Sequence, residues 1–144
     1  MTERKLENII ADKLRALGFE CICSTFGNNE EDETASAVVT IDTGTRSQAM
    51  WEIPQYDIPF TLTLEQRIET DADKSAYLEN VEKITDLLAP FCSRGGRAAL
   101  TDAFTIADEF SPVYFQLNGG TNEVDREASV YTFEQSFTLR GIIK

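Results

Sequence analysis

The sequence contains no histidine, and its 144 residues include 13 lysines and arginines against 25 aspartates and glutamates, for a formal net charge of −12. The absence of histidine excludes Ser-His-Asp and Cys-His nucleophile pairs, imidazole metal ligands and the usual proton shuttle near neutral pH. The shortage of basic residues argues against a surface that grips DNA or anionic lipid, because such surfaces depend on clustered lysine and arginine. These absences favour a structural role over catalysis.

Cysteine is also scarce, since the chain has only Cys21, Cys23 and Cys92. Cys21 and Cys23 are two residues apart in a predicted strand, so both point to one face. We interpret the cysteines as reduced core residues of a protein made in a reducing cytosol, with a redox-active pair as the alternative. A metal site would need more ligands than these, so we expect neither a metal nor a cofactor.

Long apolar runs are absent as well. No segment approaches the ~18 apolar residues of a membrane span, and the first residues lead into a charged amphipathic stretch that lacks the apolar run of a secretory signal. With 42% hydrophobic and 26% charged residues, the composition is that of a globular protein. The length predicts one domain over residues 1–144, large enough to bury a core without disulfides or metals.

Hydrophobic periodicity predicts the main elements. Apolar residues at helical spacing predict a first helix that Thr2 caps and Gly18 ends, with Arg4, Glu7, Asp12 and Arg15 on its solvent side. Strict alternation predicts long strands over Tyr56–Glu69 and Ala128–Ile143. A second helix begins at Thr70 or Asp71, and Pro90 helps to end it. Further strands are expected at Phe19–Thr25, Ala37–Ile41, Phe104–Ile106 and Val113–Leu117, with turns at Ser93–Ala99 and Asn118–Gly120.

This order predicts an α+β fold, with a mixed, mainly antiparallel sheet of about five to six strands and two helices packed on one face. A strand of about 14 residues spans about 48 Å, whereas a compact domain of this length is only about 37 Å across. The long strands therefore either bend, at Pro59 and Gly141, or project as β-arms. Projecting arms with apolar alternation require a partner to cover them, which suggests assembly.

A few side chains are candidates for binding. Arg94 and Arg97 flank Gly95-Gly96, where they would clamp an anion, contact another subunit or simply remain solvated. Trp51 and Tyr56 lie between prolines and polar turns, so each is either an exposed binding anchor or a residue at the core edge. Candidate acid–base pairs such as Asp71 with Asp73 lie in turns or on polar faces, which argues against catalysis.

Two further polar features have structural interpretations. The loop from Gly27 to Glu33 carries Glu30, Glu31, Asp32 and Glu33, but its spacing is not that of a calcium-binding loop, so we interpret it as a solvated acidic loop. Gln66 and Gln135 interrupt apolar strand faces, and they would hydrogen-bond to each other if their strands were neighbours.

The order of the elements is similar to that of a known protein family. An amphipathic helix ends in Leu17-Gly18, and a long alternating strand reads Asp57-Ile58-Pro59-Phe60-Thr61-Leu62-Thr63-Leu64. A helix then crosses over between Tyr77 and Leu88, and the last strand runs from Tyr131-Thr132-Phe133 to Gly141-Ile142. Over nearly its whole length the chain resembles tailed-phage tail terminators, the minor tail protein U family of tail completion and neck proteins.

This resemblance implies a non-enzymatic structural protein of the virion tail or neck, assembled in the host cytoplasm. It implies a homo-oligomeric, hexameric ring at the head-proximal end of the tail tube, which halts tube growth and joins the tube to neck and head-completion proteins. Neither a cofactor nor a membrane is implied, and DNA would pass without specific binding. The alternatives are a head-tail connector, a tail-tube-associated protein, or a cytosolic non-enzymatic binding or adaptor module.

For such a ring we expect two groups of functional residues. Trp51, Tyr56, Arg94 and Arg97 are candidates for a subunit interface, and the acidic loop Glu30, Glu31, Asp32 and Glu33 is a candidate for the channel wall. Negative charge facing the channel would repel DNA phosphates and keep the passage free of sticking.

Overall fold

The fold is described by a computed structural model that covers residues 1–23, 37–50, 52–92 and 96–144. The elements, in chain order, are α1 (Thr2–Ala16), β1 (Glu20–Cys23), β2 (Ala37–Thr43), β3 (Ser47–Gln48), β4 (Gln55–Arg67), α2 (Asp71–Cys92), α3 (Arg97–Phe104), β5 (Phe110–Asp125) and β6 (Val130–Ile143). The strands form one sheet in the order β1-β2-β4-β6-β5, with β3 paired to β4. The β1–β2 pair is parallel and the other pairs are antiparallel, which confirms the predicted α+β fold with its mixed, mainly antiparallel sheet.

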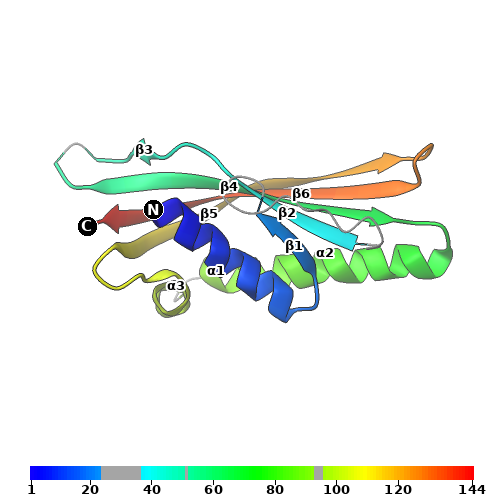
Figure 1. The fold of residues 1–144 in the computed structure, drawn as a ribbon, viewed down its shortest axis with the longest axis horizontal. Helices are drawn as coiled ribbons and strands as arrows, with labels where there is room; N and C mark the ends of the chain where they lie inside the picture. The colour runs from blue at the N-terminus through cyan, green and yellow to red at the C-terminus, as the bar shows by residue number, and fades with distance from the viewer. Residues whose placement is uncertain (24–36, 51, 93–95) are drawn as a thin grey trace.

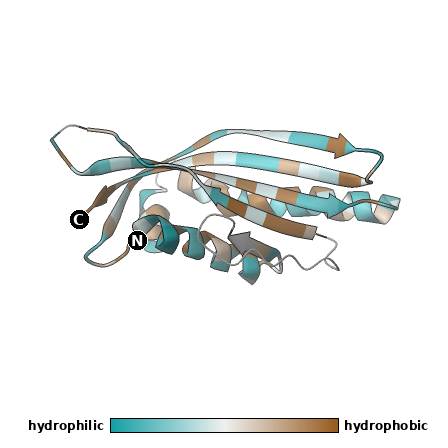
Figure 2. Cartoon of the chain, turned by 45° about the horizontal axis from the view of Figure 1, so that its top comes forward, coloured by the Kyte–Doolittle hydropathy of each residue, from teal (hydrophilic) through white to brown (hydrophobic). Residues whose placement is uncertain are grey.

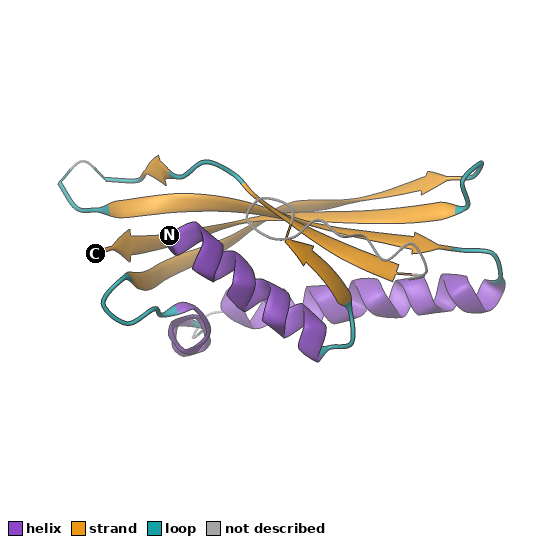
Figure 3. Cartoon of the chain, in the orientation of Figure 1, coloured by secondary structure: helices purple, strands orange, loops and turns teal. Residues whose placement is uncertain are grey.

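The described helices lie together on one face of this sheet, and the other face carries none of them (Figures 1 and 3). Strands β4, β5 and β6 contain 13, 16 and 14 residues and run along the long axis of the molecule (Figure 1). The β3–β4 hairpin extends beyond the helices at one end, while the β5–β6 turn lies at the other (Figure 1). The long strands predicted from the alternation are therefore present, and one hairpin projects as an arm. No helix within the described residues has the length and hydrophobicity that a membrane crossing requires.

The hydrophobic core lies between the sheet and the helices. Alternate residues of β4 and β6 are buried, so hydrophilic and hydrophobic positions alternate along the strands (Figure 2). Phe137 of β6 is fully buried, and its ring stacks on Phe60 and Phe115 with centroid distances of 5.2 and 4.9 Å. Helix α1 contributes Leu6, Ile10 and Leu14 to this core, and α2 contributes Tyr77, Ile84 and Leu88.

Pro59 occupies a break in the hydrogen-bonding of β4. The β2 partner ends where Thr43 pairs with Phe60, and the β3 partner begins where Ser47 pairs with Asp57. Pro59 lies between the ends of these two partner strands, so its missing N–H removes no backbone hydrogen bond to β2 or β3. Gly44 fills the gap, because its N–H donates to the Pro59 carbonyl at 2.9 Å.

Two predicted elements between α2 and β5 are wrong. The segment Ser93–Ala99 was expected to be a flexible turn, but Arg97 to Ala99 form the first turn of α3. The predicted strand Phe104–Ile106 is also absent, because Phe104 ends α3 and Ile106 makes only an isolated bridge to Phe110. Helix α3 is a third helix on the covered face, in addition to the two predicted, and it buries Leu100 and Phe104.

The predicted turn at Asn118–Gly120 is an irregularity inside a strand. Strand β5 continues to Asp125, and its register against β6 shifts between Leu117 and Gly120, where Gly119 has a φ of 96°. A glycine with positive φ suits a β-bulge as well as a turn. The chain turns later, where the Asp125 carboxylate accepts hydrogen bonds from the N–H groups of Glu127 and Ala128, both at 3.1 Å.

The polar residues on the apolar strand faces have partners other than those predicted. Gln66 and Gln135 do not bond to each other, because the register pairs Gln66 with Tyr131 and Gln135 with Leu62. Asn80 of α2 donates to the Gln66 amide oxygen at 2.9 Å, and Gln135 donates to the Gly119 carbonyl at 2.8 Å. Among the cysteines, Cys21 is buried as expected, whereas Cys92 is exposed.

Helix α1 buries two carboxylates that the sequence pattern does not reveal. Thr2 does not cap the helix, because its hydroxyl donates to Glu109 at 3.1 Å. Glu7, predicted on the solvent side, is fully buried and accepts a hydrogen bond from Thr43. Glu3 is 6% exposed and is paired by the Arg46 guanidinium, whose Nε lies 2.8 Å from Oε2. These contacts fix α1 against the β2–β3 segment, because a buried carboxylate without a partner would be costly.

Helix α2 begins with a reciprocal capping arrangement that gives a testable pH dependence. The Asp73 carboxylate accepts from the N–H groups of Glu69 and Thr70, and the Asp73 N–H donates to the Thr70 hydroxyl. The bond from Glu69, followed by those from Thr70, holds the pKa of Asp73 below its ordinary value near 3.8. Because this pKa is lowered in the folded state, the stabilisation is present above the ordinary value and is lost as the pH falls through the lowered one.

We therefore expect Asp73→Ala to lower the melting temperature at pH 7, and the difference from the wild type to shrink as the pH falls below 3.8 and through the lowered pKa of the carboxylate. Thermal melts followed by circular dichroism across this range measure the effect. Asp71→Ala is the matched control, because Asp71 shares the first turn of α2 but accepts neither capping bond. A gap between wild type and Asp73→Ala that is independent of pH would contradict this assignment.

Candidate functional site

The face of the sheet opposite the helices is a polar surface, which we call the helix-free face. Because the buried residues of β4 and β6 point towards the helices, the alternate residues point away from them. The register places charged and hydroxyl residues of five strands on this face. Its charged members are Glu20, Asp42, Asp57, Glu65, Arg67, Glu123, Asp125, Glu134 and Arg140, and its hydroxyl members are Thr40, Thr61, Thr63, Thr121, Thr132, Ser136 and Thr138.

The helix-free face is acidic, with seven carboxylates against two guanidinium groups among the described residues. Both Asp57 oxygens accept from Arg140, with Oδ1 2.7 Å from Nε and Oδ2 3.1 Å from Nη2. The hydrogen bonds from Arg140 to Asp57 raise the pKa of this guanidinium, which therefore stays charged. Since this pair neutralises itself, the remaining charge of the face is dominated by carboxylates.

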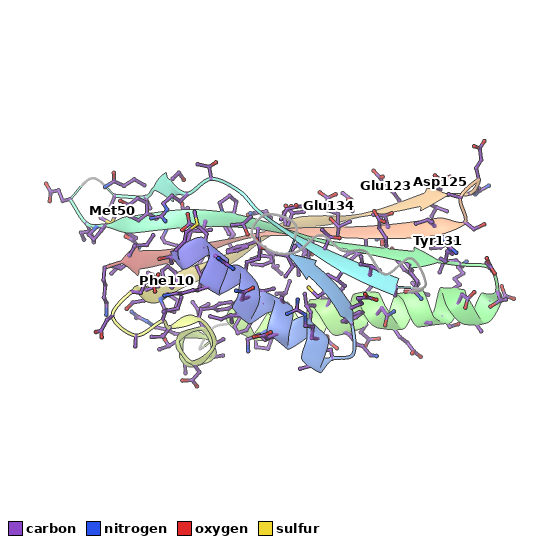
Figure 4. The ribbon with its side chains drawn as sticks, viewed as in Figure 1. Met50, Phe110, Glu123, Asp125, Tyr131 and Glu134 are labelled. Carbon is purple, nitrogen blue, oxygen red and sulfur yellow. The ribbon has the colours of Figure 1, made fainter. Side chains whose placement is uncertain are left out.

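Threonines separate the carboxylates at the end of this face that lies near the β5–β6 turn. Glu134 lies between Thr63 and Thr121 on the neighbouring strands, and Thr132 lies between Glu65 and Glu123. Like charges directly opposite each other on neighbouring strands are destabilising, so this alternation lets the sheet carry an acidic surface at low cost. Glu123, Asp125 and Glu134 point away from the helices (Figure 4). The result is an exposed, acidic and hydroxyl-rich surface rather than a cleft.

The projecting β3–β4 hairpin contains one of the predicted interface residues. Tyr56 is half-buried, and the Arg46 guanidinium carbon lies 5.5 Å from the centroid of its ring. The same guanidinium pairs with Glu3, so Tyr56 is part of the contact that holds α1. Met50 and Ile53 near the tip are 48% and 42% exposed, which leaves apolar side chains on the arm.

The other predicted site residues are only partly placed. Arg97 is exposed at the first position of α3. Trp51 and Arg94, together with the acidic loop residues Glu30, Glu31, Asp32 and Glu33, lie outside the described residues. Of the predicted interface residues only Tyr56 and Arg97 are described, and they lie on separate elements, the β3–β4 hairpin and α3. Sequence reasoning also missed the carboxylates of the helix-free face, because they occur singly along strands and become neighbours only through the register.

The described residues do not assemble an obvious catalytic constellation. Within them, no group of three or more cysteine, aspartate or glutamate side chains is arranged to hold a metal ion. Desolvation raises the pKa of the Cys92 thiol, so little of it is the nucleophilic thiolate at neutral pH. A pocket of about 480 Å³ at the start of α2 is lined by Ile68, Glu69, Thr70, Asp71, Lys74 and Tyr131. Its threonine and backbone groups are already engaged in capping the helix.

Comparisons with known proteins leave the function to be argued from this geometry. The chain matches no protein-family model, and a search of curated proteins found no significantly similar sequence. The helix-free face, with its solvated carboxylates, is suited to meeting a polyanion without binding it, since binding would require clustered lysine and arginine. The arm and the long edge strand β5 are suited to contacts with other protein subunits.

Proposed function

We propose that the chain is a non-enzymatic structural subunit of a tailed-phage virion, a tail terminator or tail completion protein that forms a ring at the head-proximal end of the tail tube. The observation that carries this proposal is the acidic helix-free face on a sheet of long strands. A ring that surrounds a DNA channel needs an extended wall that repels phosphate, and this face has the required charge and shape. The order of helices and strands, which resembles that of the tail terminator family, supports the same role.

The rest of the fold is compatible with ring formation. A ring of identical subunits requires two different complementary surfaces on each subunit, because its contacts are heterologous. The open sheet has two different edges, β5 at one side and the short β1 at the other, and an arm projects from one end. In this proposal the helix layer faces outwards, the helix-free face lines the channel, and neither a metal nor a cofactor takes part.

The direct test uses the tail tube protein encoded in the same genome. We expect the purified chain to bind at one end of polymerised tubes and to stop their growth, so that added tube protein no longer lengthens them. Negative-stain electron microscopy measures both the tube lengths and the end-bound density. Tubes that elongate equally with and without the chain, and ends that stay bare, would overturn the proposal. An adaptor module would instead leave tube length unchanged.

A further inference from the structure

Strand β5 is the terminal strand of the sheet, so only one of its two edges is paired with another strand. The bonds at the end of β6 show which backbone groups point to the other edge. The Ile143 N–H donates to the Pro54 carbonyl beside β4, and the Lys144 N–H donates to the Glu109 carbonyl beside β5, both at 2.9 Å. Because this direction alternates along a strand, odd-numbered residues of β6 bond towards β4 and even-numbered ones towards β5. Residues of β5 that pair with odd-numbered residues of β6 therefore direct their N–H and C=O groups to the outer edge.

The chain itself closes much of the first half of this outer edge. Phe110 exchanges two backbone hydrogen bonds with Ile106, at 2.9 and 3.0 Å, and Pro112 has no N–H to offer. The Leu117 backbone is hydrogen-bonded to the thiol of Cys92, the last residue of α2. These contacts act against the addition of a further strand here, as covered edges and prolines do in other sheets.

The second half of the outer edge, next to the β5–β6 turn, is open, and we call residues Gly120–Asp125 the distal β5 edge. Gly120, Asn122 and Val124 pair with odd-numbered residues of β6, so their backbone groups point outwards. Within the described residues these outward groups have no hydrogen-bond partner. Val124 is also 50% exposed. An open edge of this kind is a template for a strand of another chain.

We propose that two copies of this chain pair through their distal β5 edges, antiparallel and about a two-fold axis at Asn122. In an antiparallel pair, residues whose backbone groups point to the shared edge lie opposite each other. This register sets Asn122 opposite the same residue of the second copy and Gly120 opposite Val124, so all the outward groups find partners. Gly120 has no side chain, which leaves room for the exposed Val124.

The side chains of the helix-free face fit a second copy in this register. Thr121 lies opposite Glu123 of the second copy, so like charges do not face each other. Within one subunit Glu134 is opposite Thr121 and Thr132 is opposite Glu123. The alternation of threonine and glutamate therefore continues across the contact. A shift of two residues in one direction would set Glu123 opposite itself, and a shift in the other direction would set it opposite the bulge at Gly119.

Helix α2 also has an exposed apolar side chain on this side of the subunit. Leu78 is 59% exposed and lies a little over half a turn from Asn80, which bonds to Gln66 of β4. Leu78 therefore faces away from β4, on the side of α2 from which Cys92 reaches Leu117. The two-fold axis puts the second α2 on the same face of the sheet and next to this side, where it would cover Leu78.

The paired form goes beyond the proposed function and does not depend on it. The contact is isologous and closes on two copies, whereas the contacts of a ring of identical subunits are heterologous. The pair is a form of the free subunit in which the open edge is protected, and it separates wherever a ring uses the β5 edge.

Sedimentation velocity over a range of protein concentrations measures the dimer. Thr121→Lys should tighten it, because each lysine then faces Glu123 of the other copy, and Thr121→Glu should weaken it. The dimer contains this contact twice, so we expect the dissociation constant to change roughly 2- to 30-fold in the two directions. Thr63→Lys and Thr63→Glu are the matched controls, because Thr63 also lies opposite Glu134 but belongs to β4, inside the sheet. They should leave the dissociation constant close to that of the wild type.

A cysteine at the two-fold axis tests the register. In a Cys92→Ser background, which removes the exposed thiol, Asn122→Cys should form a disulfide-linked dimer on oxidation. Cα atoms of a directly opposed, hydrogen-bonded pair are about 5.5 Å apart, within the range of a disulfide. Val124→Cys is the matched control, since Val124 lies opposite Gly120 rather than itself. Non-reducing gels measure the linked fraction, and circular dichroism verifies that each variant is folded.

Three outcomes would overturn this pairing: a wild type that stays monomeric at every concentration, Thr121 variants that shift the dimer no more than the Thr63 variants, or crosslinking as efficient at Val124→Cys as at Asn122→Cys. The capping of tail tubes is measured separately by electron microscopy. A chain that caps tubes but fails these tests would retain the proposed function and lose only the pairing, and a chain that pairs but does not cap tubes would do the reverse.

Discussion

Phe137→Asp is expected to unfold the chain. Phe137 is fully buried in β6 and stacks on Phe60 and Phe115, at the centre of the contact between the sheet and the helices. Removing a buried phenylalanine ring costs about 3–5 kcal/mol. A carboxylate in the same place adds the cost of burying a charge without a partner. Together these approach or exceed the total stability of a typical domain, about 5–15 kcal/mol.

Far-UV circular dichroism and thermal melting of the purified variant measure this loss, with expression in inclusion bodies as the extreme result. Ser136→Asp is the matched control, because Ser136 precedes Phe137 on the same strand and lies on the helix-free face opposite Thr61. It should fold with a melting temperature close to that of the wild type. If Phe137→Asp melts cooperatively near the wild-type temperature, then the assigned facing of β6 is wrong.

The sequence predicted the long strands because one physical constraint acts along their whole length. In β4 and β6 one face is buried under the helices and the other is not, so apolar and polar residues must alternate. The same reasoning predicted the facing of Phe137. The position of Pro59 is clear only from the pairing, since it lies where the partner strands of β4 are interrupted.

The missed elements depend on contacts that are distant in the sequence. Helix α3 is only eight residues long, so its own propensity is weak, and burial of Leu100 and Phe104 stabilises it. The bulge at Gly119 has the same local signature as a turn, because both need a residue with positive φ. Cys92, expected in the core, is exposed at the last position of α2.

The candidate functional surface was harder to predict than the fold for a related reason. Glu65, Glu123 and Glu134 are far apart in the sequence and look like ordinary solvent-facing residues of separate strands. The register of β4, β5 and β6 makes them neighbours, alternating with threonines. The net charge therefore predicted an acidic surface, but only the pairing of the strands shows where on the molecule the carboxylates gather.

In the proposed ring, the charge of the helix-free face has two opposing effects. Its carboxylates repel a passing polyanion, whereas subunits that share a net charge of −12 repel one another as well. If the proposed ring forms, a variant that neutralises carboxylates of the helix-free face should assemble at least as well as the wild type because this mutual repulsion falls, and any defect should appear in DNA passage.

Gly141→Ala is expected to destabilise the chain without changing its surface charge. A Cβ at this position would lie 2.1 and 2.3 Å from carbons of the Phe110 ring and 2.8 Å from the Ser111 carbonyl oxygen. Phe110 is fully buried at the start of β5, so neither the ring nor the strand can move away freely. The sequence left open whether β6 bends at Gly141 or projects, and the contacts show that Gly141 permits close approach of β5 to β6. Overpacking of this kind costs about 1–3 kcal/mol.

Chemical denaturation measures this loss as a shift in midpoint, and Gly120→Ala is the control. A Cβ at Gly120 would meet the Gln135 side-chain oxygen at 3.0 Å, the Glu134 carbonyl oxygen at 3.3 Å and a Phe133 ring carbon at 3.4 Å, so it would be crowded far less than a Cβ at Gly141. Combining Gly141→Ala with Phe110→Leu should cost less than the two changes summed, because the smaller side chain vacates the space that the new methyl group needs. Strictly additive losses would show that Phe110 does not set the requirement for glycine. A coupled result would establish that one packing contact fixes the register from which the β5–β6 hairpin extends.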